Sequence, residues 1–129
     1  MPSLRTTVLL CLVIIAPALL SAADTRDLPH AFAAGWQGEK TCDLLFADAT
    51  VRVGRCEFPP GVGHEKHYHR PHFGYVLEGS TMRISDSVGT REVSNRAGDS
   101  WSTDAVTVHE AVNVGKTTAR YLIVEPIRP

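Results

Sequence analysis

Four of the chain's six histidines lie in one short segment, residues 61–79. His67 and His69 are two residues apart. If this segment is a β-strand, both imidazoles project from the same face, because side chains on a strand alternate with a period of two. Two imidazoles on one face can bind a single transition-metal ion. The segment therefore predicts a metal site, and the rest of the chain must position it.

The composition is that of one globular domain without a marked charge excess. Of 129 residues, 43% are hydrophobic and 21% are charged, which is unlike the profile of a disordered chain. Lys and Arg number 13 against 14 Asp and Glu. The chain therefore lacks the basic excess that would indicate binding to nucleic acid or to an anionic membrane surface. A small molecule or a metal ion is the expected partner.

Residues 1–23 have the pattern of a secretory signal peptide. Arg5 precedes an almost wholly apolar stretch from Val8 to Leu20, and residues 21–23 are small, as a cleavage site requires. The apolar stretch is interrupted by Pro17 and is shorter than the roughly 20 residues of a membrane-spanning helix, so an anchor is the weaker alternative. We expect a secreted or periplasmic protein with no membrane contact after cleavage.

From Thr41 onwards the sequence indicates short β-strands. Apolar and polar residues alternate between turns that recur roughly every 8–12 residues, a spacing typical of sandwiches and barrels. The sequence thus predicts an all-β, antiparallel barrel domain over residues 41–129, preceded by an N-terminal arm over residues 24–40 that crosses the domain surface. Within the arm, residues 31–34 can form one helical turn, and His30 is expected in solvent.

Cys42 and Cys56 are the cysteines that remain after removal of residues 1–23. A hairpin that turns near Asp48 and Ala49 places them about opposite each other if Gly54 marks a β-bulge, which adds one residue and shifts the facing. The shift also places Cys56 on the same face as the valines before Gly54. In an oxidising compartment this placement predicts a disulfide. Two small buried thiols are the alternative.

Two segments resemble the signature motifs of the cupin superfamily. The first family motif, G-x5-H-x-H, three or four residues and E-x6-G, resembles residues 61–79. The second, G-x5-P-x-G-x2-H-x3-N, resembles residues 98–113, where Asp104 and Val106 replace the proline and the glycine. The resemblance implies a small single-domain cupin, with the double-stranded β-helix or jelly-roll barrel of that family and a divalent transition metal inside it.

Carried over position by position, the resemblance implies His67, His69 and His109 as metal ligands. The family's glutamate falls on His72, six residues before Gly79, and His72 becomes the candidate fourth ligand. Without a carboxylate, neutral imidazoles favour Fe(II), with Zn, Ni or Cu as alternatives, over manganese. Neutral ligands also leave the charge of the metal uncompensated, which favours a chelating or anionic substrate.

Other residues near the motifs have simpler interpretations. His64 lies an odd number of positions from His67, among turn residues, and is expected on the surface. Glu78 is expected at a solvated strand end, and Asn113 is expected to cap a turn or to form hydrogen bonds. Trp101 lies where the second motif approaches the barrel mouth and is a candidate for ligand contact, although aromatic residues on strands usually pack in the core.

Two functions are compatible with these residues. The first is a non-haem iron dioxygenase-type enzyme, in which three histidines leave coordination positions open for a small substrate. The second is a non-catalytic module that binds or senses a small ligand, in which four histidines close the coordination sphere, as in structural zinc sites. A hydrolase is less favoured, because no Gly-x-Ser-x-Gly motif is present.

A second copy of the chain is also an expected partner. Val112 and Val114 alternate with His109 and form an apolar face on the opposite side of their strand. A second subunit or the N-terminal arm can bury such a face. The sequence therefore predicts a homodimer.

Overall fold

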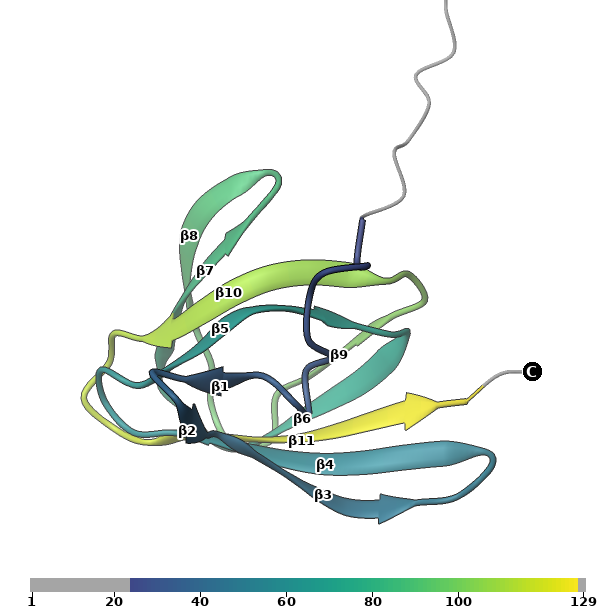
Figure 1. Ribbon diagram of the computed structural model, residues 1–129. Helices are drawn as coiled ribbons and strands as arrows, with labels where there is room; N and C mark the ends of the chain where they lie inside the picture. Colours follow the sequence, from purple (N-terminus) through teal and green to yellow (C-terminus); the bar gives the residue numbers. More distant parts are fainter. Residues whose placement is uncertain (1–23, 128–129) are drawn as a thin grey trace, which may run out of the picture.

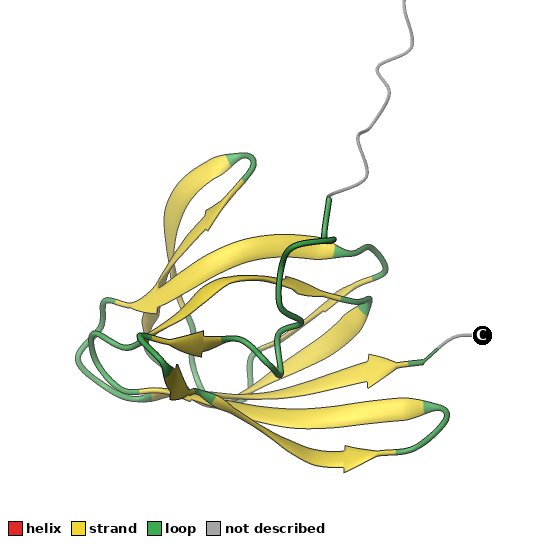
Figure 2. Ribbon diagram, in the orientation of Figure 1, coloured by secondary structure: helices red, strands yellow, loops and turns green. Residues whose placement is uncertain are grey.

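The computed structural model describes residues 24–127, which form strands and turns and contain no helix (Figure 1, Figure 2). The strands are β1 (Gly35–Trp36), β2 (Glu39–Lys40), β3 (Cys42–Ala47), β4 (Val51–Phe58), β5 (Gly63–His69), β6 (His72–Glu78), β7 (Thr81–Asp86), β8 (Gly89–Ser94), β9 (Ser100–Thr103), β10 (Thr107–Asn113) and β11 (Ala119–Pro126). The predicted signal peptide, residues 1–23, lies outside the described residues. Across residues 24–127, no helix has the length and apolar character needed to cross a membrane.

Two antiparallel sheets enclose the interior of the domain (Figure 1). One sheet has the strand order β3-β4-β11-β6-β9, and the other has the order β5-β10-β7-β8. Strands that are far apart in the chain thus pair with each other, as β4 does with β11 and β5 with β10. This is the jelly-roll arrangement, and it confirms the predicted all-β fold.

Strands β3 and β4 form the predicted hairpin. Asp48 closes its turn, because the Oδ1 atom accepts hydrogen bonds from the backbone N–H groups of Thr50 and Val51 at 2.7 and 2.9 Å. Cys42 lies directly opposite Cys56, and a disulfide joins them. The predicted cysteine pairing is therefore present in the structure.

The β-bulge of this hairpin lies on the other strand from the one that the sequence predicted. The register shifts between Leu44 and Phe46 on β3, whereas Gly54 on β4 pairs regularly with Ile123 of β11. Gly54 therefore shares the buried face of Cys56, and the valines before it do not join that face. The glycine is needed for a different reason. The Phe32 ring occupies the place of a side chain, only 2.3 Å from where a Cβ atom would lie.

The N-terminal arm is part of the packed structure. It bridges to β5 in parallel at His30 and Tyr68, and Ala31 is fully buried. The predicted helical turn is present, since the Ala34 N–H donates to the His30 carbonyl at 3.0 Å. In Figure 1 the arm runs across the side of the barrel between the two sheets.

The core lies between the sheets, where inward-facing side chains meet. Its buried members are Cys42, Cys56, Phe58, Val76, Met82, Ala111, Ala119, Tyr121 and Ile123. Asn113 ties the turns together at one end, because its Nδ2 atom donates to the Phe58 and Thr117 carbonyls at 2.7 and 2.8 Å. This confirms the hydrogen-bonding role predicted for Asn113.

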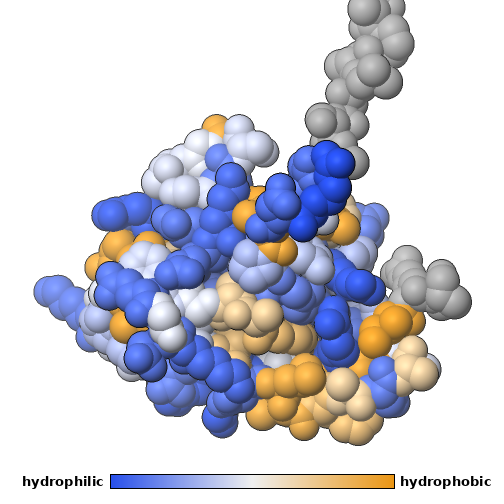
Figure 3. Space-filling model, viewed as in Figure 1, coloured by the Kyte–Doolittle hydropathy of each residue, from blue (hydrophilic) through white to orange (hydrophobic). Residues whose placement is uncertain are grey.

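Apolar side chains also reach the surface at the free edge of the five-stranded sheet. Leu44, Leu45 and Phe46 of β3 are each about half exposed, and an apolar patch covers this edge in Figure 3. Val112 and Val114, the pair predicted to face a second subunit, are half-buried within the chain itself. The homodimer stays a prediction.

Candidate metal centre

Two neighbouring strands bring three of the predicted ligands together. His67 and His69 are buried on β5, and His109 of β10 lies directly opposite His67 in the antiparallel register. One ring nitrogen of each histidine can serve as a ligand, and these three atoms lie within 4.8 Å of one another. The pairing of β5 with β10 thus assembles a triad from two distant parts of the sequence.

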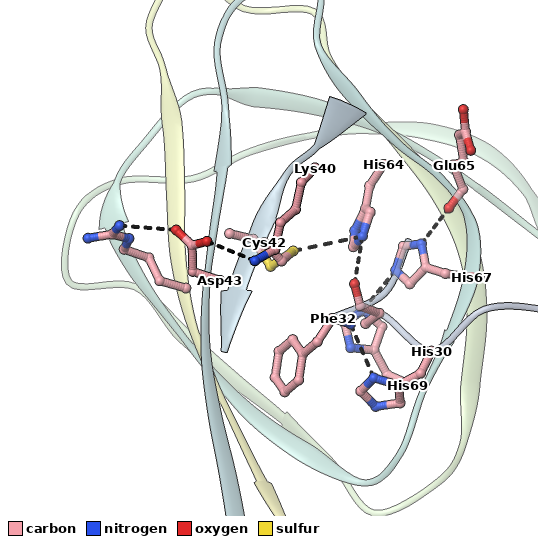
Figure 4. The surroundings of a disulfide bond; sticks show 12 residues. His30, Phe32, Lys40, Cys42, Asp43, His64, Glu65, His67 and His69 are labelled. Carbon is pink, nitrogen blue, oxygen red and sulfur yellow. Dashed lines mark hydrogen bonds and ion pairs between the residues drawn. A yellow bond between two sulfur atoms is a disulfide. The ribbon is translucent and has the colours of Figure 1, made fainter. Parts of the chain in front are cut away.

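The hydrogen bonds of the triad orient its donor atoms. The Nδ1 atom of His67 lies 2.6 Å from the Glu65 carbonyl (Figure 4). A carbonyl only accepts, so Nδ1 carries the proton and the Nε2 lone pair of His67 is free. This Nε2 atom lies 2.9 Å from Nε2 of His69. The Nδ1 atom of His69 is buried without a hydrogen-bond partner.

Burial keeps the triad uncharged. Burial, together with a smaller effect of repulsion from neighbouring imidazoles, lowers the pKa of His67 to about 2 and the pKa of His109 to about 4. The pKa of His69 is also far below its ordinary value, chiefly because of burial. Neutral imidazole is the form that binds metals. Three such nitrogens converging in the interior suit iron, zinc, copper or nickel.

His72 lies beside the triad with both of its ring nitrogens engaged. It is buried on β6, and its ring centre is 4.6 Å from that of His69. Its Nδ1 atom is 2.8 Å from the Arg70 carbonyl, and its Nε2 atom accepts a hydrogen bond from the Trp101 indole N–H at 3.2 Å. The structure therefore separates His72 from the converging donors, and its role as a fourth ligand stays a prediction.

A cavity of about 390 Å³ adjoins the triad. Imidazoles of His69, His72 and His109 form part of its wall. Most of the remaining wall is apolar and aromatic and includes Phe58, Met82, Ile84, Val93, Trp101, Tyr121 and Ile123. Its volume is within the range of small-molecule sites, roughly 300–1,000 Å³. Trp101 lies on the wall of this cavity, and its contact with a ligand stays a prediction.

His64 is buried next to the triad, so its predicted surface position was wrong. Its ring centre lies 3.8 Å from that of His67, and its Nε2 atom is 2.9 Å from the Ala31 carbonyl (Figure 4). The reason is a β-bulge in β5. His109 pairs with His67 but Ala111 pairs with His64, so between these pairs one residue of β10 lies opposite two of β5. The extra residue turns His64 to the inner face.

Glu125 is a buried residue of this region that the sequence reasoning missed. It lies on β11 with no exposed surface, and its Oε2 atom is 2.8 Å from His30 Nε2 and 2.9 Å from the Arg52 guanidinium. His30 is therefore not in solvent as predicted, because it pairs with this carboxylate. A signal was available: Tyr121, Ile123 and Glu125 alternate along the last strand, so the glutamate takes an inward position.

Comparisons with known proteins agree with this geometry. A family model described as a cupin domain matches residues 54–125, more than half of the chain. A cupin domain from Bordetella pertussis Tohama I superposes with a TM-score of 0.62 and 18% identity, over 69% of this chain and 98% of its own. The polyketide cyclase RemF from Streptomyces resistomycificus gives a TM-score of 0.56 and 21% identity, over 85% and 81% of the two chains.

A predicted oxalate decarboxylase from Thermotoga maritima is also similar in structure. Its TM-score is 0.52 and its identity is 21%, over 81% of this chain and 96% of its own. At such identities the likeness concerns the fold, and these proteins carry different functions on it. No curated protein matches the sequence.

Proposed function

Because this chain belongs to the cupin domain family, we propose that its histidine triad is the metal centre of an exported Fe(II)-dependent, dioxygenase-type enzyme. The substrate is a small, largely apolar molecule with one chelating or anionic group. The observation that carries the proposal is the convergence of His67, His69 and His109 within 4.8 Å, beside a cavity of about 390 Å³. Because the structural relatives have different functions, the proposed activity is based on the residues of the site and not on the relatives.

The number of available donors favours an open centre. Both nitrogens of His72 are engaged by Arg70 and Trp101, so three protein ligands remain for a metal. Three ligands with vacant positions are the arrangement of catalytic rather than structural metal sites. A bound Fe(II) ion would supply Lewis acidity and an electron for chemistry with dioxygen.

The walls of the cavity select the substrate. The apolar side chains of Met82 and Ile84 exclude water and contact the body of the molecule, since apolar walls with a few polar groups are typical of ligand sites. Three neutral imidazoles bring no negative charge to a divalent ion, so an anionic or chelating group of the substrate is directed to the triad. Trp101 is held on the wall by its hydrogen bond to His72.

A second candidate is a non-catalytic module that binds or senses a small ligand. It is favoured by the position of His72, whose ring centre is only 4.6 Å from that of His69. If His72 released Trp101 and joined the triad, four histidines would close the coordination sphere. No position would then remain for chemistry.

Metal analysis of protein purified without added metal tests both candidates. We expect about one iron per chain, oxygen uptake with a suitable chelating substrate, and loss of the iron in His109→Asn. The variant His72→Phe, which removes both ring nitrogens, should keep its iron. Loss of the metal in His72→Phe would instead support the closed module, and tightly bound zinc without oxygen uptake would overturn the oxygenase.

Export of the protein is supported by the disulfide between Cys42 and Cys56, because disulfides persist in oxidising compartments. The signal-peptide pattern of residues 1–23 agrees with it. N-terminal sequencing of the protein recovered from the periplasm or medium should begin at residue 24. A mature protein that retains Met1 inside the cell would contradict export.

A further inference from the structure

Glu125 is a carboxyl side chain in the interior that the proposed function does not use. It has no exposed surface and occupies the inward position after Ile123 on β11. Burial of a carboxylate is unfavourable unless partners hold it. Arg52 supplies the opposite charge at 2.9 Å, and His30 Nε2 lies 2.8 and 3.1 Å from the two carboxylate oxygens.

The proton of His30 is placed by its other nitrogen. The backbone N–H of Phe32 donates to Nδ1 of His30 at 3.1 Å. Because Nδ1 is therefore the acceptor, the proton of a neutral His30 lies on Nε2 and points to Glu125. Both Arg52 and His30 thus donate hydrogen bonds to the Glu125 carboxylate.

On the other side of this carboxylate, one ring nitrogen of His69 lacks a hydrogen-bond partner. Its Nε2 atom faces His67, while its Nδ1 atom is buried without a hydrogen-bond partner. Glu125 Oε1 lies 3.9 Å from this Nδ1 atom, which is longer than a hydrogen bond. Oε1 is also the less engaged oxygen, because Arg52 and the shorter His30 contact are both on Oε2. A shift of about 1 Å would therefore give a charge-assisted hydrogen bond.

We propose that Glu125 is the carboxylate that holds His69 with its proton on Nδ1 and so directs the Nε2 lone pair of His69 to the metal. The proposal rests on the metal centre proposed above. A metal-binding histidine commonly donates its second ring N–H to a carboxylate or a carbonyl, which fixes the tautomer and the ring orientation. For His67 the Glu65 carbonyl has this role, and for His69 Glu125 takes it.

This assignment also gives the arm a role at the centre. His30 comes from the arm, Arg52 from β4 and Glu125 from β11. The first motif has His72 in place of the family's glutamate. In our proposal a carboxylate from the last strand, Glu125, contacts His69 and would not itself bind the metal. Glu125 is a positioning residue, and it acts through His69.

The test is the zinc affinity of Glu125→Gln, measured by competition with a chromophoric chelator. In this variant Arg52 and His30 still donate to the amide oxygen, so the NH2 group faces the Nδ1–H group of His69. Two hydrogen-bond donors then face each other, and no hydrogen bond can form between them. We expect zinc binding to weaken by about 10- to 100-fold. Long-range ¹H–¹⁵N NMR of the zinc-bound protein should show the Nδ1–H tautomer of His69 in the original sequence and its loss in the variant. Glu57→Gln, which removes a surface carboxylate paired with Arg120, is the matched control and should bind zinc normally.

A second variant separates positioning from stability. Arg52→Gln breaks the same buried ion pair but keeps the carboxylate, so we expect a lower melting temperature with the zinc affinity and the His69 tautomer retained. Equal losses of affinity in both variants would reduce Glu125 to a structural role and overturn the proposal. So would normal zinc binding by folded Glu125→Gln. If the original protein bound no zinc at all, the metal centre itself would fail, whereas normal zinc binding by the variant would overturn only the role of Glu125.

Discussion

His64 shows at the residue scale how strongly the interior changes the chemistry of a histidine. Burial lowers its pKa to about 4, although its hydrogen bond to the Ala31 carbonyl acts in the opposite direction. His109 has a pKa of about 4 for the same chief reason. The triad and its neighbour are therefore a group of imidazoles that the fold keeps in the neutral form.

These pKa values predict that the metal-free protein loses stability in acid. Between about pH 6.5, the ordinary pKa of histidine, and about pH 4, the unfolded chain binds protons that the folded chain does not. Stability is therefore fully present above this range and falls as the pH decreases through it. Urea unfolding in the presence of a chelator at pH 7, 5.5 and 4.5 should show a falling midpoint.

The matched control for this prediction is His64→Gln. Its amide can still donate to the Ala31 carbonyl but binds no proton in this range, so its pH dependence should be shallower. A midpoint that stays constant from pH 7 to 4.5 would contradict the prediction. Metal binding by the folded protein should weaken only near pH 4 and below, where protons begin to compete for His109.

At the scale of elements, three strand glycines each make room for an aromatic ring from another segment. Phe32 covers Gly54, Trp36 covers Gly63 and Trp101 covers Gly74, with ring atoms 2.2 to 2.6 Å from where a Cβ atom would lie. Glycine on a strand often marks such a close approach. These rings fix the arm and β9 against the barrel, and Trp101 thereby joins the cavity wall.

The variant Gly54→Ala should loosen the N-terminal arm. Its Cβ would overlap the Phe32 ring, and overpacking of this kind lowers stability by about 1–3 kcal/mol. Hydrogen exchange of residues 29–34 should become faster, with little change in β7 and β8. Phe32→Ala is the partner in a double-mutant cycle, and the double variant should lose less stability than the sum of the two single losses. Additive losses would show that the glycine does not act through Phe32.

At the scale of the whole molecule, the disulfide limits the unfolded chain as well as the folded one. Cys42 and Cys56 are 14 residues apart and join β3 to β4. Closing a loop of about this size in the unfolded ensemble stabilises a protein by about 3 kcal/mol in the chain-entropy account. The effect is felt by the entire domain, because small domains usually unfold in one step.

Replacement of both cysteines should therefore lower global stability. We expect Cys42→Ala/Cys56→Ala to reduce the free energy of unfolding by about 2–4 kcal/mol. Urea denaturation followed by circular dichroism measures this change. The original protein treated with a reductant should behave similarly, and an unchanged midpoint in both samples would contradict a stabilising disulfide.

Local patterns were sufficient for much of the fold. Alternation of apolar and polar residues identified strands, Gly and Pro located the turns, and the opposed positions of Cys42 and Cys56 predicted the disulfide that the structure contains. The two histidine motifs indicated the family and the triad of His67, His69 and His109. The strands and the cysteine pairing depend on neighbours in sequence, which strand periodicity reports directly, whereas the inclusion of His109 was implied by the family resemblance.

The tertiary structure decided what surrounds the triad. A bulge in β5 turned His64 inward, and the alternation of side chains along a strand does not reveal where a bulge will occur. His30, Arg52 and Glu125 met only because the arm, β4 and β11 converge on one point of the interior. The sequence by itself determined which imidazoles the chain offers, since that depends on residue type and spacing. Hydrogen bonds to Glu65, Arg70 and Trp101 decided which ring nitrogens are free. Long-range packing decided that Glu125 is the carboxylate next to these histidines, because a buried carboxylate is stable only where partners from other segments contact it.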